Sequence, residues 1–243
     1  MQVFVTGTDT GIGKTFVTAG LAAVMQSLGY KAGVYKPFQS GAEEKNGFLI
    51  SPDLSYVKKL DFYVDTLCTY LLYAPTAPYV AAQEQGVTIN LGTVSREFLT
   101  LKQSCETVLV EGAGGLMVPV TKDALMGDVA KMLDIPILIV ARPDLGTINH
   151  TLLTINQAKV MGLDIAGVVI NRYPQGTNDL AIKTAPRLIE EYSDVSILGI
   201  LPDIPNFDEI KPGALINIFI NSVDIEKIFR IKIPKPVSYT HLT

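Results

Sequence analysis

The 243-residue sequence has few of the residues from which disulfide frameworks, zinc sites and polyanion-binding surfaces are built. Its two cysteines, Cys68 and Cys105, are far apart and outside any CxxC or Cys/His spacing, so neither a disulfide scaffold nor a zinc site is predicted. Lysine and arginine total 20 against 24 acidic residues, and there is no dense basic run. We therefore expect neither nucleic acid nor an anionic membrane as a partner.

Signals for membrane insertion and export are also missing. No apolar run approaches the roughly 20 residues that a membrane-spanning helix needs. From Met1 the sequence passes directly into a strand-like segment, without a basic leader, an apolar stretch or a cleavage signature. We therefore expect a cytoplasmic protein.

Short apolar, β-branched runs alternate along the chain with longer segments of helical periodicity. The predicted strands are residues 3–5, 32–35, 107–110, 137–140, 165–170 and 197–200. The predicted helices are residues 14–28, 92–105, 125–133, 148–161 and 180–192. This alternation predicts an α/β fold with a mostly parallel central sheet and helices on both faces. With 48% apolar residues the chain can bury one such core, which we assign to a single domain over residues 1–230.

The first predicted strand leads into the segment TGTDTGIGKT, residues 6–15, which then opens a helix. In this context the backbone N–H groups of a glycine-rich loop cradle phosphate oxygens at a helix start. Lys14 would neutralise phosphate charge, and the Thr15 hydroxyl can ligate magnesium. Thr8 stands where the strict GxxxxGK[ST] pattern has glycine. The pattern predicts a P-loop NTPase-like domain; a glycine-rich turn with a solvated lysine is the alternative.

Other polar side chains follow predicted strands at the carboxyl edge, where open α/β sheets bind ligands. Lys36 would bring a second cation to the phosphate, which suits phosphoryl transfer; otherwise it is a surface lysine at a strand end. Glu111 begins a glycine-rich segment and resembles a Walker-B magnesium ligand; the alternatives are a helix cap or a side chain facing water. Asp53 is either a second metal ligand or the N-cap of the following helix.

Two segments near later strands allow two interpretations each. Residues 146–149 precede an apolar helical stretch, so their N–H groups can receive a carboxylate, although an ordinary helix cap is the more general explanation. His150 follows them, and a lone histidine at a helix start is more often structural than an acid or base. Asn171, which ends a predicted strand, is a candidate for contact with adenine or a turn residue.

Taken together, several motifs resemble the dethiobiotin synthetase family in order and spacing over residues 1–220. They are residues 7–15, Lys36-Pro37 with Ser40-Gly41, Pro75-Thr76-Ala77-Pro78, residues 111–115 and residues 146–150. The resemblance implies an ATP- and Mg²⁺-dependent ligase of biotin synthesis. Such an enzyme joins CO2 to 7,8-diaminononanoate as a carbamate, phosphorylates the carbamate, and closes the ring to dethiobiotin when the second amine displaces phosphate. It also implies a homodimer.

The resemblance assigns roles to individual positions. The expected catalytic cations are Lys14 and Lys36. The expected metal ligands are Thr15, Asp53 and Glu111. The expected nucleotide contacts are Asp9, Thr10, Gly11, Ile12, Gly13, Lys14, Thr15 and, for adenine, Asn171. Substrate contacts are expected from Ser40 and, across the dimer interface, from Gly146, Thr147, Ile148 and Asn149.

The chain departs from the family pattern at two places. Some family members carry an acidic residue at Gly11, and residues 231–243 read as an extraneous or disordered tail.

A partitioning-type ATPase switch would have an additional lysine at the position of Asp9. A cobyrinic acid amidating synthetase would add a glutamine-hydrolysing domain, for which this chain has neither the length nor a suitable cysteine motif. Both alternatives are disfavoured.

Overall fold

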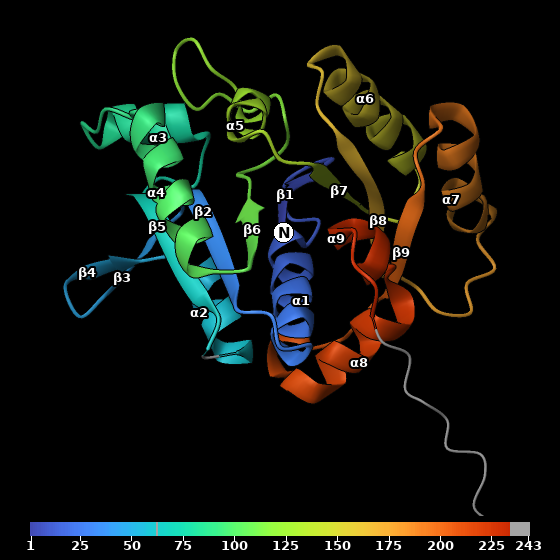
Figure 1. The fold of residues 1–243 in the computed structure, drawn as a ribbon. Helices are drawn as coiled ribbons and strands as arrows, with labels where there is room; N and C mark the ends of the chain where they lie inside the picture. The colour runs from blue at the N-terminus through green and yellow to red at the C-terminus, as the bar shows by residue number, and fades with distance from the viewer. Residues whose placement is uncertain (62, 234–243) are drawn as a thin grey trace, which may run out of the picture.

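The computed structural model describes residues 1–61 and 63–233, so the predicted tail lies outside the described residues from residue 234 onward. Seven strands form a parallel sheet in the order β5-β2-β6-β1-β7-β8-β9 (Figure 1). They are β1 (Gln2–Gly7), β2 (Ala32–Ser40), β5 (Asp65–Leu72), β6 (Thr107–Glu111), β7 (Ile137–Ala141), β8 (Ile165–Tyr173) and β9 (Ile197–Pro202). A separate antiparallel hairpin joins β3 (Glu43–Lys45) to β4 (Phe48–Ile50).

Helices cover both faces of the sheet. One face carries α1 (Lys14–Ser27), α2 (Pro52–Leu60), α8 (Pro212–Ser222) and α9 (Ile225–Phe229). The opposite face carries α4 (Leu91–Ser104), α5 (Met126–Leu133), α6 (Thr147–Val160) and α7 (Leu180–Ser193). Helix α3 (Pro78–Glu84) packs at the end of β5, and a three-residue 3-10 turn, η1 (Phe207–Glu209), follows β9. No described helix has the length and apolarity that a membrane crossing needs.

The alternation of side chains along each strand explains these two layers. Val3 and Val5 of β1 contribute to the core beneath α1, whereas Phe4 belongs to the core on the opposite face. A strand with helices on both sides is apolar on both of its faces, which is why residues 3–5 of β1 and all of β7 read as continuous hydrophobic runs. The predicted α/β fold with a parallel sheet between two helical layers is confirmed.

All six predicted strands end before the observed ones, and the difference is largest in β2 and β8. Strand β2 continues to Ser40, so Lys36 lies inside it, because its pairing with β5 extends on both sides of Pro37. The pairing of β2 with β6 stops at Tyr35, and the missing N–H of Pro37 therefore costs no bond on that side. Strand β8 continues to Tyr173 through an irregularity at which Arg172 has a left-handed φ of 57°.

Strand β5 was not predicted, although it pairs with β2 along most of its length. It lies at the edge of the sheet and is only half-buried, with Asp65, Thr66 and Thr69 among its residues. The apolar run that marks the central strands is therefore broken here. At the other end of the chain, Ile231 and Ile233 donate backbone hydrogen bonds to Glu226 of α9.

Candidate active site

The loop between β1 and α1 has the backbone geometry of a phosphate cradle. Gly11 and Gly13 have left-handed φ angles of 73° and 91°. A Cβ on Gly13 would also lie 2.1 Å from Nδ2 of Asn171, so this position requires glycine. No side chain caps the start of α1, which leaves its first N–H groups free to meet an anion.

Thr8 fits this loop because its position does not need glycine. Its φ is negative, and its N–H donates to the carbonyl oxygen of Val140 at 3.0 Å, which extends the pairing of β1 with β7. A residue of any type can adopt a negative φ. The mismatch with the strict motif therefore leaves the geometry of the glycines and of Lys14 unchanged.

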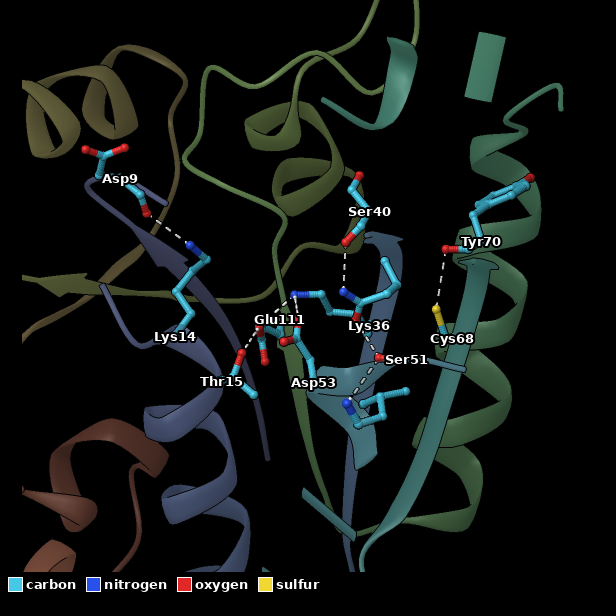
Figure 2. A network of polar contacts seen from close by, with 12 residues as sticks. Asp9, Lys14, Thr15, Lys36, Ser40, Ser51, Asp53, Cys68, Tyr70 and Glu111 are labelled. Atoms are coloured by element: carbon cyan, nitrogen blue, oxygen red, sulfur yellow. Dashed lines mark hydrogen bonds and ion pairs between the residues drawn. The ribbon is translucent and has the colours of Figure 1, made fainter. Parts of the chain in front are cut away.

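Lys14 is buried, so the alternative of a solvated lysine is wrong. Its Nζ donates to the backbone oxygen of Asp9 at 3.0 Å, across the mouth of the loop (Figure 2). Burial lowers the pKa of Lys14 to about 8, although Glu111 acts in the opposite direction. An anionic ligand would stabilise the charged form of this lysine, because it would interact with the ammonium group in place of the water that burial excludes.

Lys36 lies between two carboxylates. Its Nζ is 2.6 Å from Oδ2 of Asp53 and 2.7 Å from Oε1 of Glu111, and Thr15 donates to the same Glu111 oxygen at 2.8 Å (Figure 2). Lys36 is only 4% exposed and Glu111 only 1%. The alternatives of a surface lysine at position 36 and of a water-facing or helix-capping residue at position 111 are therefore wrong.

The charges in this cluster shift one another's proton affinities. Burial lowers the pKa of Lys36, but Glu111 and Asp53 together outweigh it and hold the pKa above its ordinary value. For Asp53, burial is outweighed by Lys36 and the pKa is lowered, whereas burial dominates at Glu111 and raises its pKa. Lys36 is thus held in its charged form at neutral pH, and Glu111 is the carboxylate that gains most from a further positive charge.

Helix α2 places Asp53 at this cluster. The N-cap of α2 is Ser51, whose Oγ accepts a hydrogen bond from the N–H of Leu54 at 3.1 Å, and Pro52 occupies the first turn. The alternative role of Asp53 as the N-cap is therefore wrong. Ser51 also donates to Oε1 of Gln39 at 2.5 Å, which ties the start of α2 to the end of β2.

The oxygen atoms around Lys36 suit a divalent cation that brings further ligands with it. Oε2 of Glu111 is buried without a hydrogen-bond partner, and Thr15 and Asp53 add oxygen atoms beside it. Among the described residues, no group of three or more His, Cys, Asp and Glu side chains is placed to hold a metal ion. Mg²⁺ fits such a site, because it binds through one or two carboxylates together with phosphate oxygens.

A cleft of about 770 Å³ runs along the carboxyl edge of the sheet. Most of the predicted site residues line it: Thr10, Gly11, Gly13, Lys14, Thr15, Lys36, Ser40, Asp53, Glu111 and Asn171. Ile12 lines a smaller neighbouring pocket, and Oδ1 of Asp9 accepts from the N–H of Thr10 at 2.7 Å. At Gly11 a side chain would meet open space but would be strained by the left-handed φ.

Asn171 reaches the phosphate loop from β8. Its Nδ2 donates to the carbonyl oxygen of Ile12 at 2.9 Å, and the residue is 2% exposed. Because a carbonyl oxygen can only accept, the amide nitrogen must face Ile12 and the amide oxygen must face elsewhere. Asn171 lies within β8 rather than in a turn.

Residues 146–149 lie outside the cleft of their own chain. Gly146 is the N-cap of α6 with a φ of 98°, and Oγ1 of Thr147 donates to the carbonyl oxygen of Arg142 at 2.5 Å. His150 meets Nη2 of Arg142 through Nδ1 at 3.2 Å. Residues 146–149 therefore do not line the cleft that Lys14 and Lys36 share.

Several residues in the wall of the cleft were not predicted. Tyr56, Met117 and Phe207 line it, although none belongs to a recognisable motif. The sequence pattern of aromatic and apolar residues in helices or loops is the same whether they line a cleft or pack in the core. They reach the cleft only through the packing of α2, of the loop after β6 and of the segment after β9.

A glycine-rich loop connects β1 to α1 at the carboxyl edge of the parallel sheet, and it carries a buried lysine. These features define a P-loop nucleotide-binding protein. Residues 1–211 match the protein-family model described as an AAA domain. The fold is similar to that of the cell division ATPase MinD from Pyrococcus furiosus, with a TM-score of 0.60 over 94% of this chain and 98% of that one. Sequence identity to it is 18%, so this likeness concerns the fold alone.

Sequence comparison identifies the family. The chain is 43% identical to an ATP-dependent dethiobiotin synthetase BioD of Anoxybacillus flavithermus, over 84% of this chain and 92% of that protein. It is 37% identical to the enzyme of the same name from Bacillus subtilis strain 168, over 91% and 98% of the two chains. The chain belongs to the ATP-dependent dethiobiotin synthetase family. The partitioning-type switch and the cobyrinic acid synthetase are not favoured by these relatives.

Proposed function

We propose that this chain converts 7,8-diaminononanoate, CO2 and ATP into dethiobiotin, ADP and phosphate. One amine attacks CO2 and loses a proton to give a carbamate, and a carbamate oxygen then attacks the γ-phosphorus of ATP while ADP leaves. The second amine attacks the carbonyl carbon, and phosphate leaves as the ring closes. The observation that carries the proposal is a second buried lysine, Lys36, beside the P-loop lysine in one cleft.

Lys36 and Lys14 have different tasks in this proposal. Lys36 stabilises the negative charge shared by the carbamate and the γ-phosphoryl group, because a fixed cation in a site with little water stabilises negative charge that develops in the transition state. Lys14 binds the phosphate chain together with the loop N–H groups of residues 9–13. Ser40 has a buried Oγ without a partner and contacts the carbamate, while Asn171 contacts adenine.

Thr15, Asp53 and Glu111 would hold Mg²⁺ in this cleft. Their oxygen atoms are the donor type that this ion prefers, and the unpartnered Oε2 of Glu111 supports the assignment. The ion supplies neutralisation of the phosphate oxygens on which charge develops. We further propose one synthetase domain over residues 1–230 in a cytoplasmic enzyme.

The proposed reaction predicts dethiobiotin in a mixture of the protein, diaminononanoate, bicarbonate, ATP and magnesium, detected by mass spectrometry. Glu111→Gln should keep the fold but require more magnesium for half-maximal turnover, because an amide is a poorer ligand than a carboxylate for a hard cation. The exposed Glu84 of α3 offers a matched control, and Glu84→Gln should behave like the unchanged protein.

Two results would contradict this prediction separately. Absence of dethiobiotin from a folded protein that binds ATP rejects the proposed reaction. An unchanged magnesium requirement in Glu111→Gln rejects Glu111 as a metal ligand and leaves the reaction intact.

We also propose a homodimer in which the substrate carboxylate is received at residues 146–149 of the partner subunit. Three observations support it: these residues lie outside the cleft of their own chain, the start of α6 offers N–H groups, and apolar side chains near them are exposed. Leu145, directly before these residues, and Leu153 of α6 are 83% and 59% exposed, and Val160 at the far end of α6 is 81% exposed. A second subunit would cover this apolar surface and bring the helix start to the other cleft.

Sedimentation should therefore show a species of twice the chain mass. Leu153→Glu should shift it toward the monomer and abolish ring formation, because charge on an apolar interface opposes association, while each chain still binds ATP. Leu99→Glu, at an exposed leucine of α4, is the matched control and should stay dimeric and active. An active monomer at assay concentrations would refute the shared site without affecting the phosphate loop.

A further inference from the structure

Helix α2 contributes two neighbouring side chains to the wall of the cleft. Its buried face, Leu54, Val57 and Leu60, packs into the core beneath α1. Asp53 and Tyr56, one turn apart, both line the cleft. Asp53 meets Lys36 at the catalytic end, whereas Tyr56 meets the segment that follows β9. A single short helix therefore contacts both the charged cluster around Lys36 and the segment after β9.

The segment after β9 is irregular and depends on α2 for its position. It turns at Asn206, which has a left-handed φ of 56°, into the three-residue η1. The hydroxyl of Tyr56 donates to the carbonyl oxygen of Phe207 at 3.3 Å, and Nζ of Lys59 donates to that of Asp208 at 2.5 Å. Burial raises the pKa of Tyr56 to about 12, so this hydroxyl keeps its proton at ordinary pH.

Aromatic rings hold the same segment from both sides. The Phe207 ring packs edge-on against Tyr56, with centroids 5.8 Å apart, and against Phe16 of α1, with centroids 6.1 Å apart. Phe16 in turn packs on Phe219 of α8. Tyr56, Phe16 and Phe207 all line the cleft. Edge-to-face pairs of this kind favour one mutual orientation of the rings.

We propose that Tyr56 is a positioning residue that fixes the wall of the nucleobase end of the cleft through Phe207. The phosphate end is defined by Lys14 and Lys36. Asn171 lies near the end of β8, where Tyr173 pairs with Pro202 of β9 and accepts a hydrogen bond from the N–H of Asp203, and the chain continues from there into the Phe207 segment. The flat aromatic face of a nucleobase gains from rigid aromatic and apolar walls, whereas a phosphate chain gains nothing from them. Tyr56 thereby sets how much of the affinity for ATP comes from its base. This inference rests on the proposed use of ATP.

Inorganic triphosphate separates the two ends, because it carries the phosphates of ATP without ribose or base. We would measure Kd for ATP and for inorganic triphosphate by calorimetry at saturating magnesium. Tyr56→Phe keeps the ring and loses one hydrogen bond, and should weaken ATP binding by about two- to tenfold. Tyr56→Leu should weaken it by about tenfold or more. Both variants should bind triphosphate as the unchanged protein does.

Two further variants complete the experiment. Lys59→Met removes the second tie to the segment and should also weaken ATP binding alone. Tyr192→Phe changes an exposed tyrosine of α7 and should change neither affinity. Equal losses for ATP and triphosphate in Tyr56→Phe would overturn the proposal, as would unchanged ATP affinity in both Tyr56 variants. A protein that binds ATP with this pattern but makes no dethiobiotin would reject the proposed reaction alone.

Discussion

Replacement of Lys36 by glutamine should slow ring formation by about 10²- to 10³-fold while changing ATP affinity far less. Glutamine fills the position without the positive charge, and that charge stabilises the transferring phosphoryl group more than the bound ground state. The measurement is single-turnover formation of dethiobiotin beside the Kd for ATP. Lys31→Gln, at an exposed lysine paired with Asp65, is the control for loss of one lysine charge.

Folding must be measured with the same variant, because Lys36 separates two carboxylates. Losing one partner of a buried ion pair destabilises a protein by about 3–5 kcal/mol. The double variant Lys36→Gln, Asp53→Asn removes a carboxylate as well, and should recover thermal stability without recovering the rate. If Lys36→Gln loses affinity and turnover in equal proportion, Lys36 is only a nucleotide ligand and the mechanistic role is wrong.

Lys14→Gln should lose both ATP affinity and turnover, since Lys14 lies in the phosphate loop itself. Removing a charge-assisted hydrogen bond to phosphate weakens binding by about 10- to 100-fold. The Kd for inorganic triphosphate should rise by the same factor as that for ATP, in contrast to the Tyr56 variants. Retained affinity with lost turnover would show that Lys14 contributes to the reaction step alone.

Proton uptake gives an independent measure of Lys14. Its pKa is lowered to about 8 in the free protein, so about half of the molecules lack this proton at pH 8. Phosphate raises the pKa again, and ATP binding should therefore take up a proton near pH 8, detected by calorimetry in buffers of different ionisation enthalpy. Above pH 8 the affinity should fall, and Lys14→Gln should remove both effects.

The contributions of Lys14 and Lys36 to the free energy of unfolding should change in opposite directions as the pH rises. The folded-state pKa of Lys14 is below its unfolded value, so the folded chain holds fewer protons between them and this residue's contribution to stability rises with pH there. Lys14→Gln should therefore stabilise the protein at pH 7. The folded-state pKa of Lys36 is raised, so its stabilising contribution is present below the unfolded value and is lost at higher pH.

The sequence by itself determined the class of fold and the phosphate loop. Apolar runs alternate with helical periodicity because a parallel sheet is covered on both faces, and this signal is local. The loop was predicted for the same reason: Gly11, Gly13, Lys14 and Thr15 lie within five consecutive positions between one strand and one helix. Glu111 was marked by its place directly after a buried strand.

Only the tertiary structure decided how the charges meet and which residues close the cleft. Lys36, Asp53 and Glu111 come from β2, α2 and β6, and their distances depend on the order of strands in the sheet. The burial of Lys36, the cap of α2 and the unpartnered oxygen of Glu111 follow from packing between distant segments. Tyr56 and Phe207 are 151 positions apart, and no local pattern indicates their contact. Burial and long-range contact set the pKa values and the shape of the cleft, because both depend on what surrounds a side chain rather than on its neighbours in sequence.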